Sequence, residues 1–247
     1  MSARTLFGDE RLPLVCVPLI AQTHADLLAD AAAVVSQHPD VIEWRADHFV
    51  GIQSLDALVA AGSALREVTG DIPLIFTLRA SAEGGHPVSL SPQAVDALRL
   101  TAANELPFEF HDVEMRSPET LTSELIRRVH ARSGRVILSV HDFKGTPNDD
   151  ALVSLFSRAH QLGADVAKVA VMPQSPEDVL RLLAMTRRMS ETLPIPVVSM
   201  SMGSLGVMSR IFGGVFGSAL TFATSAGESA PGQLPIKDLR EILSRVV

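Results

Sequence analysis

Short apolar runs alternate with longer amphipathic stretches along the whole chain. The runs have the length of strands and are rich in Val, Ile and Phe, residues that favour strands. We therefore predict strands at residues 14–19, 41–45, 72–78, 108–114, 135–140, 166–171, 195–200 and 218–222. The stretches between them have helical spacing, which predicts helices at 25–37, 55–68, 92–105, 118–132, 149–162, 176–190 and 236–246.

Three of these helices have a strong start signal. Ser91, Ser117 and Ser175 each precede a proline. A serine side chain can accept from a free backbone N–H at a helix start, and proline is favoured at the first helical position. We predict these three serines as N-caps.

Strands that alternate with helices pair in parallel. About eight such units in 247 residues predict an α/β fold, a (β/α)₈ TIM barrel, with residues 1–247 forming a single domain. The alternative is an open doubly wound sheet. It is disfavoured because no glycine-rich nucleotide turn follows the first strand, and the glycines at positions 203–217 read as tight turns and close packing.

Composition narrows the class of protein. Lys+Arg total 21 and Asp+Glu 28, a net charge of −7, which argues against a nucleic-acid binder. A single cysteine, Cys16, excludes an intramolecular disulfide framework and fits a reducing compartment. The N-terminus lacks the apolar core of an export signal, and the longest uncharged stretches, 193–209 and 211–227, are too short and too rich in Gly, Ser and Thr to span a membrane.

Lys168 is the sharpest chemical signal. Only three of the 21 basic residues are lysines, and Lys168 alone lies in the middle of an apolar predicted strand. Burial favours the uncharged amine, which is a nucleophile. The alternative is a structural ion pair with a neighbouring carboxylate. Lys144 and Lys237 lie in polar surroundings and are expected to be solvated.

His141 ends the predicted strand that precedes the strand of Lys168. Inward side chains on neighbouring strands can meet, and an imidazole is a natural proton carrier near neutral pH. The alternative is a histidine that only caps a loop.

Other polar side chains lie at strand ends, where the active sites of such barrels are built. Arg45, Arg79 and Arg210 could form a positive pocket for a carboxylate, or could instead pair with acids, as Glu43 with Arg45. By position alone, Met200 and Met202 fit the core better than a ligand site.

Two other chemistries are disfavoured. No His-x-His or His-Glu-x-x-His pattern supports a metal site, and His111 and Asp112 should face opposite sides of their strand. No Gly-x-Ser-x-Gly elbow supports a serine hydrolase.

Six segments taken in order along the chain resemble type I 3-dehydroquinate dehydratase. They are Glu43-Trp-Arg-Ala-Asp47, Phe76-Thr-Leu-Arg79 with Glu83-Gly-Gly85, Ser139-Val-His-Asp-Phe143, Lys168-Val-Ala-Val-Met-Pro-Gln174, Met200-Ser-Met-Gly-Ser-Leu-Gly-Val-Met-Ser-Arg210 and Ser229-Ala-Pro-Gly-Gln233. The resemblance implies a TIM barrel, usually a homodimer, that acts in the cytoplasm on the shikimate route to chorismate and aromatic amino acids. The implied reaction converts 3-dehydroquinate to 3-dehydroshikimate and water through a lysine Schiff base, without metal or cofactor.

The resemblance also implies a role for each matching residue. Lys168 corresponds to the Schiff-base lysine, His141 to the general acid/base, and Glu83 and Asp112 to carboxylates that tune the histidine. Arg210 corresponds to the clamp on the substrate carboxylate. The remaining substrate-binding positions are Glu43, Arg45, Arg79, Ser229 and Gln233, with Met200, Met202 and Phe222 as walls.

The resemblance implies two further details of the site, and two other functions stay open as alternatives. Residues 81–89 correspond to a mobile loop that closes over the site, and Pro18 stands where some members have a serine that touches substrate. A class I aldolase would share Lys168 but break a carbon–carbon bond. A barrel that has lost activity and serves as a scaffold should lack the lysine or the histidine, and both are present.

Overall fold

The computed structural model describes residues 13–225 and 229–246. The N-terminal segment, in which we expect no export signal, lies almost wholly outside these residues. In the described part the strands are β1 (Leu14–Leu19), β2 (Val41–Arg45), β3 (Leu74–Thr77), β4 (Phe110–Glu114), β5 (Arg135–Asp142), β6 (Val166–Val171), β7 (Val197–Ser201), β8 (Leu220–Thr224) and β9 (Leu234–Pro235).

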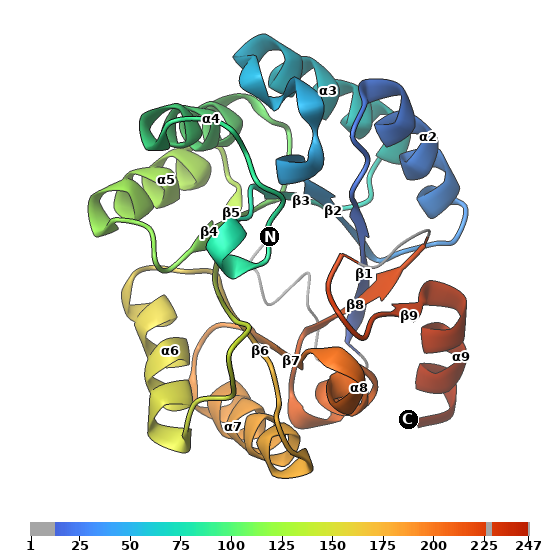
Figure 1. Ribbon diagram of the computed structural model, residues 1–247, viewed down its shortest axis with the longest axis vertical. Helices are drawn as coiled ribbons and strands as arrows, with labels where there is room; N and C mark the ends of the chain where they lie inside the picture. Colours follow the sequence, from blue (N-terminus) through green and yellow to red (C-terminus); the bar gives the residue numbers. More distant parts are fainter. Residues whose placement is uncertain (1–12, 226–228, 247) are drawn as a thin grey trace.

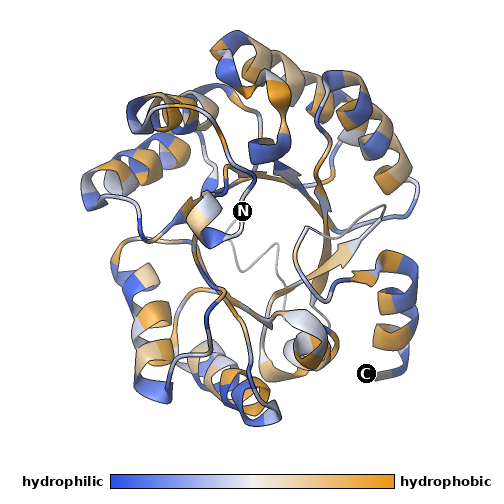
Figure 2. Cartoon of the chain, viewed as in Figure 1, coloured by the Kyte–Doolittle hydropathy of each residue, from blue (hydrophilic) through white to orange (hydrophobic). Residues whose placement is uncertain are grey.

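Helices follow the strands and form the outer layer of the molecule (Figure 1). The α-helices are α2 (His24–Val35), α3 (Leu55–Thr69), α4 (Pro92–Glu105), α5 (Glu119–Ala131), α6 (Asp149–Gln161), α7 (Pro176–Thr192), α8 (Gly203–Phe212) and α9 (Ile236–Val246). Within the described residues, the loops also contain four short 3₁₀ turns: η1 (Ala46–His48), η2 (Val50–Gln53), η3 (Ser81–Glu83) and η4 (Gly213–Phe216). Apolar and polar residues alternate along the outer helices, as expected for helices packed on a barrel (Figure 2).

The parallel strands form a closed ring. Strands β1 to β7 pair in order, and β8 pairs with β1. A bridge between Val197 and Ser218 joins the starts of β7 and β8, where the Ala219 N–H donates to the Val197 carbonyl at 2.8 Å. The ring of strands inside a ring of helices confirms the predicted α/β barrel and excludes the open sheet (Figure 1).

The strand register separates the barrel interior into an apolar end and a polar end. Ile75 of β3 pairs with Phe110 of β4, and an interior cluster at this level also contains Cys16, Val41, Ile137, Val166 and Val198. Further along the strands, Lys168 pairs with Ser139 and Ala170 with His141. Because side chains alternate between the two faces, these residues share the inner face. The polar groups thus lie inside the barrel at the C-terminal ends of the strands, and the apolar cluster fills the interior below them.

One prediction of local structure is wrong: Ser117 does not cap α5, because Pro118 occupies the N-cap position. Ser175 is the N-cap of α7, as predicted, although its side chain makes no cap bond. Ser91 is confirmed, since its side chain accepts from the Ala94 N–H at 3.2 Å.

Helix α8 is absent from the prediction. Its glycines suggested turns, yet they permit close packing: a Cβ on Gly206 would lie 2.2 Å from the Ser201 carbonyl oxygen. Gly203 starts the helix at φ 71°, in the left-handed region that glycine tolerates. The glycines therefore allow α8 to sit directly on the end of β7.

Candidate active site

A pocket opens at the C-terminal ends of the strands. Its wall contains Glu43, Arg45, Arg79, Glu83, His141, Lys168, Met200, Met202, Arg210, Phe222, Ser229 and Gln233. These are the predicted site residues apart from Asp112, which lies behind the wall against Lys168. Pro18 is not part of this wall. The fold therefore brings together side chains that are up to 190 positions apart in the sequence.

Lys168 projects from the middle of β6 and is 4% exposed. Its Nζ lies 3.1 Å from Asp112 Oδ2, 3.7 Å from Glu43 Oε1, and 4.6 Å from the centroid of the Phe222 ring. The ion pair that the sequence left open as an alternative is present. The same amine also lines the pocket, so the pairing leaves it facing the space a ligand would fill.

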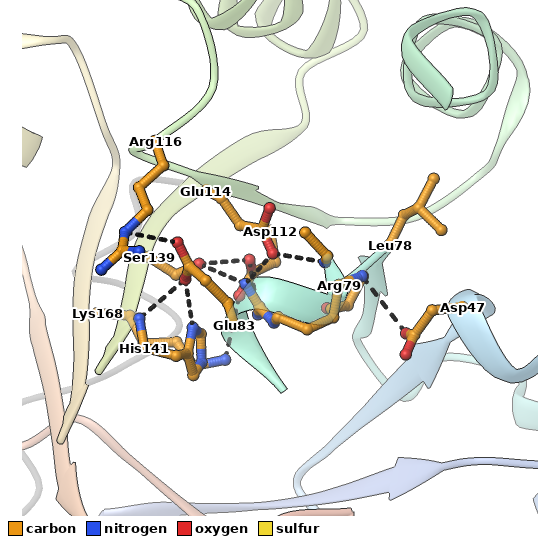
Figure 3. A network of polar contacts seen from close by, with 12 residues as sticks. Asp47, Leu78, Arg79, Glu83, Asp112, Glu114, Arg116, Ser139, His141 and Lys168 are labelled. Atoms are coloured by element: carbon orange, nitrogen blue, oxygen red, sulfur yellow. Dashed lines mark hydrogen bonds and ion pairs between the residues drawn. The ribbon is translucent and has the colours of Figure 1, made fainter. Parts of the chain in front are cut away.

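Arg79 and Asp112 form the buried support beneath this amine (Figure 3). Arg79 Nη2 lies 2.9 Å from Asp112 Oδ1, and its Nη1 donates to Ser139 Oγ at 2.9 Å and lies 3.2 Å from Glu114 Oε1. Burial alone would raise the pKa of Asp112, but the charges of Arg79 and Lys168 hold that pKa well below its usual range. Asp112 is therefore a fixed negative charge that anchors the lysine.

His141 and Glu83 form a second pair at the pocket wall. Glu83 Oε2 accepts from the His141 backbone N–H at 2.9 Å and lies 3.1 Å from the ring Nδ1 (Figure 3). Burial lowers the pKa of His141 well below its usual value, and the charges of Arg79 and Lys168 lower it further. The ring is then neutral at pH 7. When Glu83 is ionised, the ring proton sits on Nδ1 and leaves Nε2 as the acceptor.

Glu83 reaches His141 from η3, within the predicted loop 81–89. Its side chain is 1% exposed, and burial followed by the Glu114 carboxylate raises its pKa to about 7. Arg116 Nε lies 3.5 Å from its Oε1 on the solvent side. The carboxyl group thus changes charge close to neutral pH, directly beside the histidine.

Arg45 does not form the ion pair with Glu43 that the sequence analysis considered as an alternative. It pairs with Asp47, not with Glu43: its Nε and Nη2 donate to the two Asp47 oxygens at 2.9 and 2.7 Å. Its Nη1 donates to the Ser229 carbonyl at 3.3 Å. Glu43 instead accepts from the Thr77 hydroxyl at 2.8 Å. Arg45 therefore stands in the wall with a fixed orientation.

Arg210 comes from α8 and is 1% exposed. Its Nη2 donates to the Pro231 carbonyl at 3.0 Å, and its Nη1 lies 3.8 Å from Met200 Sδ. Ser229 and Gln233 bond each other, with the Ser229 N–H donating to Gln233 Oε1 at 2.8 Å. One face of the pocket is therefore cationic, next to a loop rich in hydrogen-bonding groups.

Met200, Met202 and Phe222 complete the wall with apolar surface. The two methionines line the pocket and also belong to the interior apolar cluster, so they serve as both core residues and pocket wall. Phe222 covers one side of the Lys168 amine, with Nζ 4.6 Å from the ring centroid.

Sequence reasoning assigned no role to several residues of the site. Gly84, Phe143, Ala170 and Ala230 also line the pocket. Asp47, Glu114 and Ser139 hold its arginines. Gly84 has φ 83°, and a Cβ there would lie 2.3 Å from the Phe143 ring, so this turn requires glycine. The Glu83-Gly84-Gly85 sequence was the signal from which the close approach of Gly84 to Phe143 could have been predicted.

Residues 13–225 and 229–246 contain no group of three or more His, Cys, Asp or Glu side chains arranged to hold a metal ion. His111 and Asp112 do face opposite sides of β4, since the His111 ring packs 5.8 Å from that of Phe76, outside the barrel. No helix in these ranges is long and apolar enough to cross a bilayer.

The chain is similar to known proteins over nearly its whole length. The sequence model of type I 3-dehydroquinase matches residues 15–246. A 3-dehydroquinate dehydratase of Albidiferax ferrireducens is 45% identical over 94% of this chain and 88% of its own. The crystal structure of 3-dehydroquinate dehydratase from Geobacillus kaustophilus superposes with a TM-score of 0.93 at 39% identity, covering 97% of this chain and 92% of that one.

A further solved structure is similar to this chain. The type I 3-dehydroquinate dehydratase of Clostridium difficile, described with covalently modified comenic acid, has a TM-score of 0.90 at 36% identity, covering 95% of this chain and 92% of that one. The family model matches residues 15–246, and the relatives named above are 36–45% identical to this chain. This chain belongs to the type I 3-dehydroquinase family.

Proposed function

We propose that this protein dehydrates 3-dehydroquinate to 3-dehydroshikimate and water through a Schiff base on Lys168. One observation carries the proposal: a buried lysine amine faces the pocket, and a neutral histidine lies two residues along the neighbouring strand register. The family relationship supplies the substrate. Its members include 3-dehydroquinate dehydratases, one of them described with a covalently modified ligand.

The first step makes the imine. The Lys168 ammonium gives a proton to a base, and the free amine attacks the substrate ketone. Loss of water from the resulting carbinolamine gives a protonated imine. Asp112 and Glu43 lie within 3.7 Å of the amine and stabilise this positive charge.

The second step removes a proton and a hydroxyl group. The protonated imine is an electron sink, so the proton on the adjacent carbon becomes acidic enough for the His141 imidazole to take. The enamine then pushes electrons back and expels the hydroxyl group, and His141 returns its proton to form water. Hydrolysis of the conjugated imine releases product and regenerates Lys168. Glu83 orients the imidazole through Nδ1.

The remaining wall residues suit a small, hydroxylated carboxylate. Arg210 is proposed to bind the carboxylate, because guanidinium and carboxylate match in two-pronged geometry. Glu43, Arg45, Arg79, Ser229 and Gln233 are proposed to contact the ring hydroxyl groups, with Met200, Met202 and Phe222 packing on the apolar face. Such contacts fix the ring against Lys168 and His141 and lower the barrier by orientation.

The proposed chemistry needs no metal or cofactor, because the amine supplies the electron sink and the imidazole moves the proton. A role in the shikimate pathway, a cytoplasmic location, a homodimer and a single domain over 1–247 stay predictions from the family resemblance. Closure of residues 81–89 over the site is likewise a prediction.

The reaction is tested by its product. The purified chain is mixed with 3-dehydroquinate while ultraviolet absorbance of the conjugated enone is recorded, and the product is identified by mass. We expect absorbance to rise with the loss of one water. A smaller carbonyl fragment would indicate an aldolase, and the absence of any turnover would contradict the proposal.

A further inference from the structure

Asp47 is a buried carboxylate at which three parts of the site meet. Its side chain is 0% exposed. It accepts two bonds from the Arg45 guanidinium, at 2.9 and 2.7 Å. It also accepts from two backbone groups, the His86 N–H at 2.8 Å and the Arg79 N–H at 3.4 Å. Figure 3 shows Asp47 reaching across from η1 to the end of β3.

The backbone groups that Asp47 holds flank Glu83. From Ala80 to Gly85 the chain folds into a tight turn in which the Gly85 N–H donates to the Ala80 carbonyl at 3.0 Å. A Cβ on Gly85 would lie 2.0 Å from the Arg79 carbonyl oxygen, so the turn has no slack. Glu114 fixes one end by accepting from the Ala80 N–H at 2.8 Å. Asp47 fixes the other end through His86.

The anchoring of both ends of the 80–85 turn matters because the turn contains Glu83. Glu83 lies between them, and its carboxylate meets both the backbone and the ring of His141. A displacement of the turn would move Glu83 away from the imidazole. The His48 and His86 rings lie 5.1 Å apart at the same junction, and His48 Nε2 lies 3.6 Å from Asp47 Oδ2.

We propose that Asp47 is a positioning residue with two separable tasks: it orients Arg45 toward the substrate, and it fastens the Glu83 turn onto His141. The proposal rests on the function proposed above for its kinetic consequences. Its structural part, that Asp47 fastens residues 80–86, is independent of which reaction the pocket catalyses.

Asp47→Asn is the test variant, because it keeps the size of the side chain while replacing one acceptor oxygen with a donor. Glu109→Gln is its matched control. Glu109 also joins a guanidinium and a backbone N–H, with Oε2 at 2.6 Å from Arg66 Nη2 and 2.8 Å from the Leu74 N. It precedes β4 at the opposite end of the barrel, outside the pocket.

Hydrogen exchange read by mass spectrometry, without substrate, tests the fastening. We expect peptides covering 79–88 to exchange roughly 10- to 100-fold faster in Asp47→Asn, the effect of losing a bond to a charged group. The same peptides should be unchanged in Glu109→Gln. Unchanged exchange at 79–88, or a uniform rise across the barrel in Asp47→Asn, would overturn the fastening role whether or not the chain is a dehydratase.

Kinetics with 3-dehydroquinate separate the two tasks. We expect Asp47→Asn to raise KM and to lower kcat by about tenfold or more each, whereas Glu109→Gln stays near wild type. In a double-mutant cycle with Arg45→Ala, the effect on KM should not add, because Asp47 acts on binding through Arg45. The loss in kcat should persist, because the turn is fastened without Arg45. Additive KM effects, or kcat within twofold of wild type, would overturn the proposal.

Discussion

The Lys168 amine and the Asp112 carboxylate are buried together, with Nζ 3.1 Å from Oδ2. Arg79 holds the other oxygen of the same carboxylate at 2.9 Å. One buried acid thus faces two cations, which keeps it ionised and keeps the lysine in place. The arrangement therefore fixes the position of the amine nitrogen at the wall of the pocket.

Asp112→Asn should lower both turnover and stability. Removing one partner of a buried ion pair leaves uncompensated charge, which costs about 3–5 kcal/mol. The pKa of Asp112 is lower in the folded chain than its unfolded value of about 3.9, so its contribution is complete above that pH. It is lost as the pH falls through the folded-state value. Urea unfolding between pH 7 and pH 3 checks this.

The difference in the free energy of unfolding between wild type and Asp112→Asn should be constant from pH 7 to about pH 5 and shrink in more acidic solution. A difference that grows on acidification would contradict the assignment. Asp165→Asn is the control, since that carboxylate bonds His130 and the Val136 N–H before β6, outside the pocket. We expect it to leave kcat near wild type.

His141→Ala should separate imine formation from proton transfer. Turnover should fall by about 10²–10⁴-fold, the range for loss of a general acid/base. Lys168 keeps its amine, so a covalent adduct should accumulate slowly and be visible by intact-protein mass spectrometry. His111→Gln, in a histidine outside the barrel ring, should retain turnover. Near-normal rates in His141→Ala without a trapped adduct would remove His141 from the mechanism.

Glu83 should shape the acidic side of the pH profile. With a pKa raised to about 7, this carboxyl ionises around neutral pH, and only its ionised form accepts the Nδ1 proton that leaves Nε2 free as the base. We therefore expect kcat/KM to rise with pH through about 7, as a property of the coupled Glu83–His141 pair. Glu83→Gln should slow turnover and abolish or displace that limb. An identical limb in the variant would assign it to other groups.

Arg210→Ala should weaken substrate binding. Loss of a charge-assisted bond of about 1.5–3 kcal/mol predicts a fall in kcat/KM of roughly 10- to 150-fold, carried mainly by KM. An inhibitor with the substrate carboxylate should lose affinity by a similar factor, and a carboxamide analogue should bind both proteins alike. Arg66→Ala, at the other end of the barrel, is the control. A carboxylate preference that survives in Arg210→Ala would place the anion site elsewhere.

Much of the fold follows from local pattern. The alternation of apolar runs and amphipathic stretches located every strand of the barrel wall, because each strand is buried on both sides. Strand ends were less certain: β3 begins at Leu74, two residues later than predicted, and β5 continues to Asp142. Helix α8 was missed because glycine normally disfavours helices, and only contact with Ser201 shows why Gly206 is required.

The chemistry was more visible than its supports. The sequence position alone indicated Lys168, in an apolar strand, and His141, at the end of the neighbouring strand. The family resemblance indicated the other residues of the pocket wall. The partner of Arg45 was not visible, because Glu43 and Asp47 both lie two residues from it and backbone bends decide between them. The bonds from Asp47 and Glu114 to backbone N–H groups of the Glu83 turn depend on tertiary packing alone.

The most direct test of the Schiff-base mechanism is the site of the covalent intermediate. The enzyme is treated with borohydride in the presence of 3-dehydroquinate, digested, and sequenced by mass spectrometry; Lys168→Ala is treated in parallel. Lys168 is the buried lysine of the pocket, whereas Lys144 and Lys237 are exposed. We expect a reduced adduct on Lys168, and neither adduct nor turnover in Lys168→Ala. Substrate-dependent labelling of Lys144 or Lys237, or full turnover in Lys168→Ala, would contradict it.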